Sequence, residues 1–189
     1  WSLPPTLKDR RTVEDSPGKF REVTAHWSAN GFKRWGDVHT KQPKMLILGD
    51  SFTFSSAVSD GEEWYAFLEK AFGNLELFVC GVPGYGSLQE FMMLDKFIDE
   101  IRPQAVLIQF CDNDFMDNLH ALERLYYPLR NIGFRPYLES DQIVYKMPVP
   151  FSGLRRHSFL ADRVLAIYDR HIRKQATKDI DAFSRKKNS

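Results

Sequence analysis

A short apolar run, Lys44–Gly49, stops abruptly at Asp50 and Ser51. An apolar run of this length, bounded by polar and turn-forming residues, is typical of a buried parallel strand. Two more runs of the same kind follow, Leu75–Cys80 and Ala105–Phe110, with helical patterns between the strands. Strands that alternate with helices favour right-handed crossovers and a parallel sheet with helices on both faces. The order of these segments therefore predicts a three-layer α/β/α sandwich.

Two helices are predicted between these strands from apolar spacing and from capping residues. Ser59 and Glu62 have the spacing of a capping box, and apolar residues follow them at helical intervals. Ser87 and Glu90 have the same spacing after a glycine-rich loop, and the helix behind them is predicted to end before Pro103.

Residues 1–43 are polar with scattered aromatic side chains, and we interpret them as an arm with one or two short strands packed on the main domain. Residues 44–189 form the predicted α/β domain. Three core strands are few for a doubly wound sheet, so we expect this domain to be incomplete at its C-terminus.

Beyond Asp114 the alternation of strands and helices fails. Residues 119–129 predict a short helix, and Phe134–Leu138 with Gln142–Tyr145 predict a hairpin. An apolar stripe from Leu160 to Ile172 predicts a final long helix.

Composition excludes several classes of function. The 189 residues carry a net charge of +1, which gives no overall attraction to nucleic acid or to acidic membranes. No apolar run approaches the roughly 18 residues of a membrane span, so no stable membrane insertion is expected. No basic-then-apolar leader is visible at Trp1, and the compartment stays open. Cys80 and Cys111 do not make a disulfide framework, and apolar packing is the default for both.

Three loops follow the three predicted strands, and they hold the residue types that ester hydrolysis needs. Ser51 supplies a hydroxyl that can act as a nucleophile, Gly84 a backbone N–H that no Cβ shields, and Asn113 a side-chain amide. Ligands bind beyond the carboxyl ends of strands in open α/β sheets, so we expect these groups to meet there. Each donor aimed at the oxyanion of the transition state is worth roughly 3 to 4 kcal/mol.

These motifs resemble the SGNH (GDSL-type) hydrolase superfamily of esterases, lipases and enzymes that handle acetyl groups on polysaccharides. Residues 49–53 (Gly-Asp-Ser-Phe-Thr) resemble its first block, Gly81–Gly84 its second and Asp112–Asp114 its third. The resemblance implies a flavodoxin-like sandwich, a catalytic Ser51, and an oxyanion hole made by the Ser51 N–H, the Gly84 N–H and the Asn113 amide. It implies no metal or organic cofactor. It implies a small-molecule or glycan ester as substrate and favours an acetyl ester.

The sequence departs from the family pattern at three places. Cys80 stands where the second block usually has Asn, and Cys111 where the third block usually has Gly. The family's Asp-x-x-His segment is not found at the expected place, although Asp117 and His120 have that spacing. We therefore expect the catalytic His to belong to a part of the native protein outside this chain.

Other interpretations of the same residues stay open. The same acyl-enzyme can pass its acyl group to a sugar hydroxyl, which would make the protein an O-acyltransferase. A non-catalytic binding module would keep the fold without the base. Ser51 can also be a simple turn cap, and the glycines of the second loop can serve turn geometry or hold a phosphate, although the spacing is not that of a P-loop.

Overall fold

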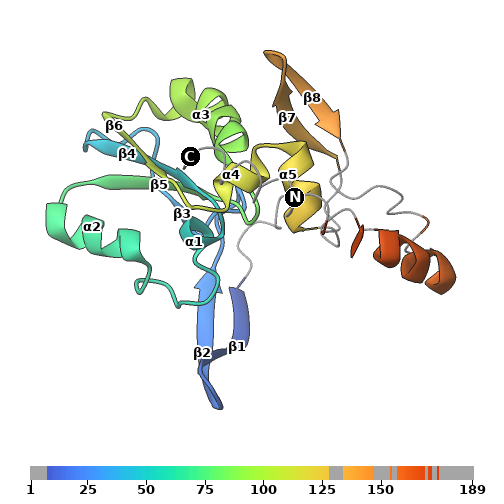
Figure 1. The fold of residues 1–189 in the computed structure, drawn as a ribbon. Helices are drawn as coiled ribbons and strands as arrows, with labels where there is room; N and C mark the ends of the chain where they lie inside the picture. Colours follow the sequence, from blue (N-terminus) through green and yellow to red (C-terminus); the bar gives the residue numbers. More distant parts are fainter. Residues whose placement is uncertain are drawn as a thin grey trace, which may run out of the picture. The chain divides into compact units, whose positions relative to one another are not determined.

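The structure, a computed structural model, describes residues 8–127, 134–146, 154, 157–168, 170, 171 and 174. The chain divides into two compact units, Trp1–Asp114 and Phe115–Ser189. Within the described residues, helices and strands follow one another along the chain (Figure 1). The prediction of a mixed α/β fold is confirmed at this level.

The sheet of the first unit has four strands in the order β3-β5-β4-β6. Their bounds are β3 (Arg34–Trp35), β4 (Lys44–Gly49), β5 (Glu76–Gly81) and β6 (Ala105–Gln109). β4 pairs in parallel with both β5 and β6, as the alternation of elements predicts. β3 pairs antiparallel with β5, so the sheet is not purely parallel.

Helices α2 (Trp64–Phe72) and α3 (Ser87–Ile101) lie on opposite sides of this sheet (Figure 1). Because side chains alternate along a strand, neighbouring residues of β4 enter different apolar clusters. The cluster with α3 contains Leu46 and Leu48, and the cluster with α2 contains Ile47. The partners on α3 and α2 are Phe97, Ile101 and Tyr65.

The predicted capping box at Ser59 and Glu62 does not cap a helix. α2 begins only at Trp64, and its N-cap residue makes no side-chain capping bond. The Glu62 carboxylate does accept a 3.0 Å hydrogen bond from the Ser59 N–H, but the Ser59 hydroxyl accepts from the Thr24 N–H at 3.3 Å. The hydroxyl is therefore used by a neighbouring strand, and the segment forms a loop.

The second predicted capping box is wrong by one residue. Gly86, not Ser87, is the N-cap of α3. The side-chain oxygen of Gln89 accepts a 2.9 Å hydrogen bond from the Gly86 N–H, so Gln89 takes the role predicted for Glu90. Glu90 is instead turned into the protein and is 1% exposed.

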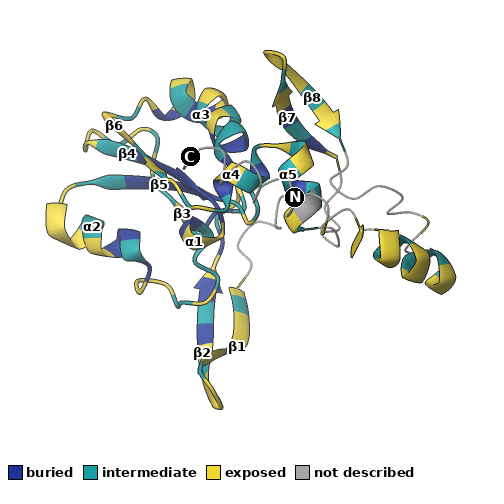
Figure 2. Cartoon of the chain, viewed as in Figure 1, coloured by how far each residue is buried: buried dark blue, intermediate teal, exposed yellow. Residues whose placement is uncertain are grey.

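The third strand, β6, is less buried than the sequence predicts (Figure 2). Val106 is 40% and Ile108 is 52% exposed, on the face that they share with Leu46 and Leu48 of β4. β6 is the edge strand of this sheet, so α3 covers the inner strands on that face and leaves these side chains in contact with solvent.

The N-terminal residues form β1 (Lys8–Ser16) and β2 (Lys19–His26), which pair antiparallel. Trp27 is 3% exposed, and its ring stacks on Phe54 at a centroid distance of 4.5 Å. Phe32 is also buried, whereas Phe20 stays exposed. Aromatic packing therefore begins at the end of β2, and the tip of the hairpin does not share in it.

The second unit holds α5 (His120–Tyr126) and a hairpin of β7 (Arg135–Glu139) and β8 (Gln142–Lys146); a short helix, α4 (Asp114–Asp117), spans the division between the units. The predicted hairpin is confirmed, and its turn residues Ser140 and Asp141 both have positive φ. Residues 159–168 are helical as predicted. Ile172, at the end of the predicted stripe, lies outside the described residues, as do the last two residues of the predicted helix 119–129.

Candidate functional site

Ser51 is the first residue of α1 (Ser51–Phe54), directly after β4. Asp50 is the N-cap residue, and its carboxylate accepts a 2.9 Å hydrogen bond from the Phe52 N–H. α1 ends after one turn because Ser55 adopts the left-handed conformation. Ser51 is exposed, whereas Asp50, the residue before it, is fully buried. The Gly-Asp-Ser motif therefore leaves the serine open to solvent and places the carboxylate inside the protein.

Two glycines let α1 lie directly on the ends of the strands. A Cβ on Gly49 would lie 2.1 Å from the Thr53 hydroxyl oxygen, and one on Gly81 would lie 2.2 Å from the Phe54 nitrogen. The Thr53 hydroxyl also donates a hydrogen bond to Gln109 at the end of β6. α1 is thus held against the carboxyl ends of β4, β5 and β6.

The Asp50 carboxylate joins the first predicted motif to the third. The Asn113 side-chain amide donates a 2.9 Å hydrogen bond to Oδ2 of Asp50. The Cys111 thiol lies 3.6 Å from Oδ1 of the same carboxylate. Ser51 and Asn113 are therefore brought to the same place, as predicted, but the Asn113 amide is directed at the residue before the serine.

The glycine-rich loop after β5 joins this region through its backbone. The Val82 N–H donates to the Gly49 carbonyl at 3.1 Å, and the Tyr85 N–H donates to the Val82 carbonyl at 3.1 Å. Gly84 has a φ of 78°, a conformation that favours glycine. Within residues 8–114, however, no hydrogen bond joins Gly84 to Ser51 or Asn113.

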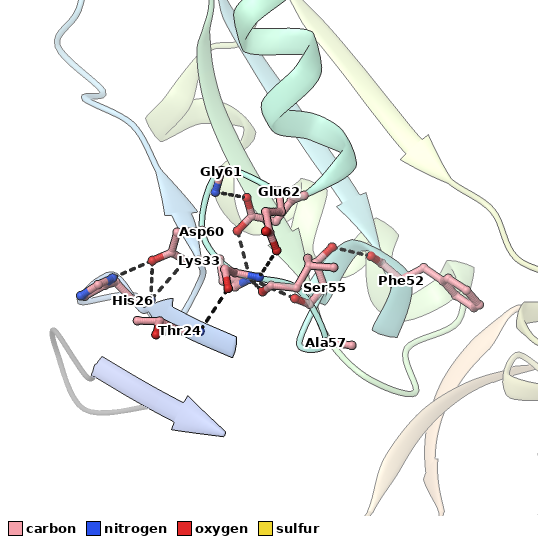
Figure 3. A network of polar contacts seen from close by, with 12 residues as sticks. Thr24, His26, Lys33, Phe52, Ser55, Ala57, Asp60, Gly61 and Glu62 are labelled. Atoms are coloured by element: carbon pink, nitrogen blue, oxygen red, sulfur yellow. Dashed lines mark hydrogen bonds and ion pairs between the residues drawn. The ribbon is translucent and has the colours of Figure 1, made fainter. Parts of the chain in front are cut away.

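No base reaches the Ser51 hydroxyl within residues 8–114, where this hydroxyl makes no hydrogen bond. His26 pairs instead with Asp60, with 2.6 Å between its Nδ1 and the carboxylate. This pair lies at the far end of the polar network from Phe52 (Figure 3). In the second unit, the His120 ring packs on Tyr137 at 5.0 Å, and Asp117 lies 3.9 Å from the Arg135 guanidinium.

Glu90 is a feature of the site that sequence reasoning missed. Neither of its carboxyl oxygens has a hydrogen-bond partner among the described residues. Burial, followed by the nearby charges of Asp114 and Asp50, raises the pKa of Glu90 to about 7. Its position was readable in principle, because Glu90, Leu94, Phe97 and Ile101 share one helical stripe.

Neither cysteine is prepared to act as a nucleophile. Burial raises the pKa of Cys80 to about 12. Burial, together with the Asp50 and Asp114 carboxylates, raises the pKa of Cys111 to about 11. Since the thiolate is the reactive form, both side chains are inert at neutral pH.

The loop after α1 is held by a buried lysine (Figure 3). The Lys33 ammonium donates to the carbonyls of Ser55 at 2.9 Å and Val58 at 2.7 Å, and it lies 3.0 Å from the Glu63 carboxylate. Both charged side chains of this ion pair are at least 95% buried. An ammonium carries three N–H donors, so its hydrogen-bonding capacity is filled by this loop and by Glu63.

A pocket of about 580 Å³ opens beside Ser51. Its lining comes from α1, from the loop that Lys33 holds and from the start of α2. The lining residues are Ser51, Phe52, Ser55, Ser56, Ala57, Val58, Glu62, Trp64 and Phe67. A cavity of this size is within the range of small-molecule sites.

Comparisons of the chain with protein-family models, with curated protein sequences and with solved structures gave no match. Among the described residues, no group of three or more His, Cys, Asp or Glu side chains could hold a metal ion. No helix in the described part of the chain is long and apolar enough to cross a membrane. An exposed serine at the ends of parallel strands, next to a pocket, is suited to attack on an electrophilic ligand.

Proposed function

We propose that this protein is a serine ester hydrolase of the SGNH (GDSL) type, with the three-layer α/β/α sandwich of that superfamily. One observation carries the proposal: the loops after β4, β5 and β6 meet around Asp50 and Ser51. The Val82 N–H bonds to Gly49, and the Asn113 amide bonds to Asp50. The resemblance assigns a nucleophile, a glycine N–H and an Asn amide to these three loops.

In the proposed reaction, a general base takes the proton of the Ser51 hydroxyl while its oxygen attacks the carbonyl carbon of the ester. The C–O bond to the alcohol then breaks, and the leaving oxygen takes up that proton from the same base. The N–H groups of Ser51 and Gly84, with the Asn113 amide, stabilise the oxyanion of the intermediate. Water then releases the acid from the acyl-enzyme. No metal or organic cofactor enters these steps, and the resemblance favours a small acyl group such as acetyl on a carbohydrate or lipid.

The reaction needs a general base, which residues 8–114 do not supply to Ser51. General-base assistance is typically worth 10²- to 10⁴-fold in rate. The proposal assigns this role to a histidine outside that range. Ser51 alone is a weak nucleophile at neutral pH, so the activity of the chain depends on whether such a histidine reaches it.

Labelling with a fluorophosphonate tests the proposal. The chain is incubated with the probe, and the adduct is measured by intact mass. Ser51→Ala is expected to abolish the adduct, whereas Ser56→Ala, a serine of the same pocket, is expected to keep it. An adduct that survives in Ser51→Ala, or hydrolysis of ester substrates that survives in that variant, would contradict the proposal.

A non-catalytic binding module is the second candidate, and the lack of a partner for the Ser51 hydroxyl within residues 8–114 favours it. Such a module would retain an ester ligand without cleaving it. Saturable binding of an acetylated glycan, with no fluorophosphonate adduct on the folded chain and no release of acetate, would support this candidate over the hydrolase.

A further inference from the structure

The pocket beside Ser51 is lined mainly by apolar side chains. Phe52, Ala57, Val58, Trp64 and Phe67 supply these groups, and together they come from three consecutive segments of the chain. Phe52 and Phe67 are 63% and 60% exposed, so much of their surface faces solvent. Apolar and aromatic side chains that line a hollow are typical of small-molecule sites.

Two polar side chains of the lining, Ser55 and Glu62, are held by hydrogen bonds, whereas the buried indole N–H of Trp64 has no partner among the described residues. The Ser55 hydroxyl donates to the Phe52 carbonyl at 2.8 Å. Glu62 pairs with Arg21 at 2.9 Å and accepts from the Ser59 N–H at 3.0 Å. The bond from Arg21, followed by the bond from Ser59, lowers the pKa of Glu62, so at neutral pH its carboxylate is ionised and paired with the Arg21 guanidinium. No Lys, Arg or His is among the lining residues, so the lining itself supplies no cation to pair with an anionic ligand.

The pocket is built rather than incidental. The buried Lys33 ammonium binds the carbonyls of Ser55 and Val58, which are two of the lining residues. Burying a charged ammonium is costly unless it is paired and hydrogen-bonded, and here all of its donors are used. The loop that forms one wall is therefore held in a single conformation.

We infer that this pocket binds the uncharged aliphatic chain of an ester, several carbons longer than acetyl, whose carbonyl lies at Ser51. The inference rests on the proposed function for the role of Ser51, and it extends that function by naming the substrate class. The chain is the acyl group of the ester or the alkyl group of its alcohol. Both are uncharged aliphatic chains, which is the chemistry that the apolar lining recognises.

Binding of 2-alkanones tests the pocket without turnover, because a ketone keeps the carbonyl but cannot be hydrolysed. Affinity for the series from 2-butanone to 2-decanone is measured by calorimetry. We expect it to rise about fourfold per added methylene until the pocket is filled. The same rise is expected in Ser51→Ala. An affinity that does not depend on chain length would overturn the inference.

A variant that fills the pocket provides the matched comparison. Ala57 and Ala71 are both exposed, but only Ala57 lines the pocket. Ala57→Trp is expected to remove the dependence on chain length, and Ala71→Trp to retain it. Equal chain-length dependence in the two variants would also overturn the inference, since binding would then occur elsewhere on the protein.

Two substrate series identify which part of the ester enters the pocket. One varies the acyl group of p-nitrophenyl esters, and the other varies the alcohol of alkyl acetates. A length dependence in the first assigns the pocket to the acyl chain, and in the second to the alcohol. Hydrolysis at the same rate across both series would contradict the inference while leaving the hydrolase intact. Length-dependent ketone binding together with ester hydrolysis that survives in Ser51→Ala would retain the pocket and reject Ser51 as the nucleophile of a hydrolase.

Discussion

The side-chain amide of Asn113 donates a 2.9 Å hydrogen bond to the carboxylate of Asp50, which is fully buried. This bond joins the loop after β6 to the residue that caps α1. The same carboxylate accepts from the Phe52 N–H at 2.9 Å. The position of Ser51 therefore depends on a buried negative charge that its neighbours must satisfy.

Asn113→Ala is expected to lower the free energy of unfolding by about 1 to 3 kcal/mol, because it leaves the buried Asp50 carboxylate without one of its donors. Urea denaturation at pH 7 measures the change. Asn74→Ala, at an exposed position after α2, is the control and is expected to stay within about 0.5 kcal/mol of the wild type. Equal losses in the two variants would show that the bond to Asp50 contributes nothing.

Glu90 is expected to make the protein less stable as the pH rises. Its pKa is raised from 4.5 to about 7 in the folded protein, so the native state binds more protons than the unfolded state between these values. Stability from this group is present below pH 4.5 and is lost as the pH rises through 7, by about 3 kcal/mol in all.

Glu90→Gln removes this titration, so we expect a flatter dependence of the unfolding free energy on pH between 5 and 8. Glu100→Gln, on the exposed side of α3, is the matched control and should keep the dependence of the wild type. Urea denaturation at several pH values compares the three proteins. If Glu90→Gln and the wild type had the same slope, Glu90 would not hold a proton in the folded state.

Cys111 is expected to react slowly with iodoacetamide at pH 7.5, although it is partly exposed. Burial and the Asp50 and Asp114 carboxylates raise its pKa to about 11, and only the thiolate reacts. Asp50→Asn removes one of these charges and should raise the alkylation rate at Cys111. Peptide mapping by mass spectrometry separates this site from Cys80. Fast alkylation of Cys111 in the folded wild type would contradict the assigned pKa.

The three parallel strands of the sheet could be predicted from local sequence pattern. The fourth strand, β3, and the order of the strands in the sheet could not. Leu46, Ile47 and Leu48 form an apolar run long enough to be recognised, whereas Arg34 and Trp35 contain no run at all. β3 exists because the Trp35 ring packs against Phe78 and Phe97, at 5.4 and 4.9 Å. Tertiary contact decides such a strand. Likewise, a local run does not distinguish an edge strand such as β6 from a central one.

The sequence predicted which residues of the candidate site lie close together, but it did not predict the hydrogen bonds and ion pairs that they form. The rule that loops meet at the carboxyl ends of parallel strands brought Ser51 and Asn113 together correctly. The burial of Lys33 had no such rule behind it, because charged residues are usually exposed. For Lys33, the partners are carbonyls of Ser55 and Val58, distant in sequence, and only the folded chain shows them.

Lys33→Met is expected to cost about 3 to 5 kcal/mol of unfolding free energy, because it leaves the buried Glu63 carboxylate without its cation. It also removes the donors to Ser55 and Val58, so 2-alkanone binding should weaken together with stability. The double variant Lys33→Met/Glu63→Gln should recover part of the stability, since no unpaired charge stays buried. It should not recover the binding, because the loop is still released.

Lys41→Met, at an exposed loop position, is the control and is expected to change neither the stability nor the binding. Urea denaturation and calorimetry measure the two effects, and full stability with weak binding in Lys33→Met would show that the ion pair serves the pocket and not the fold.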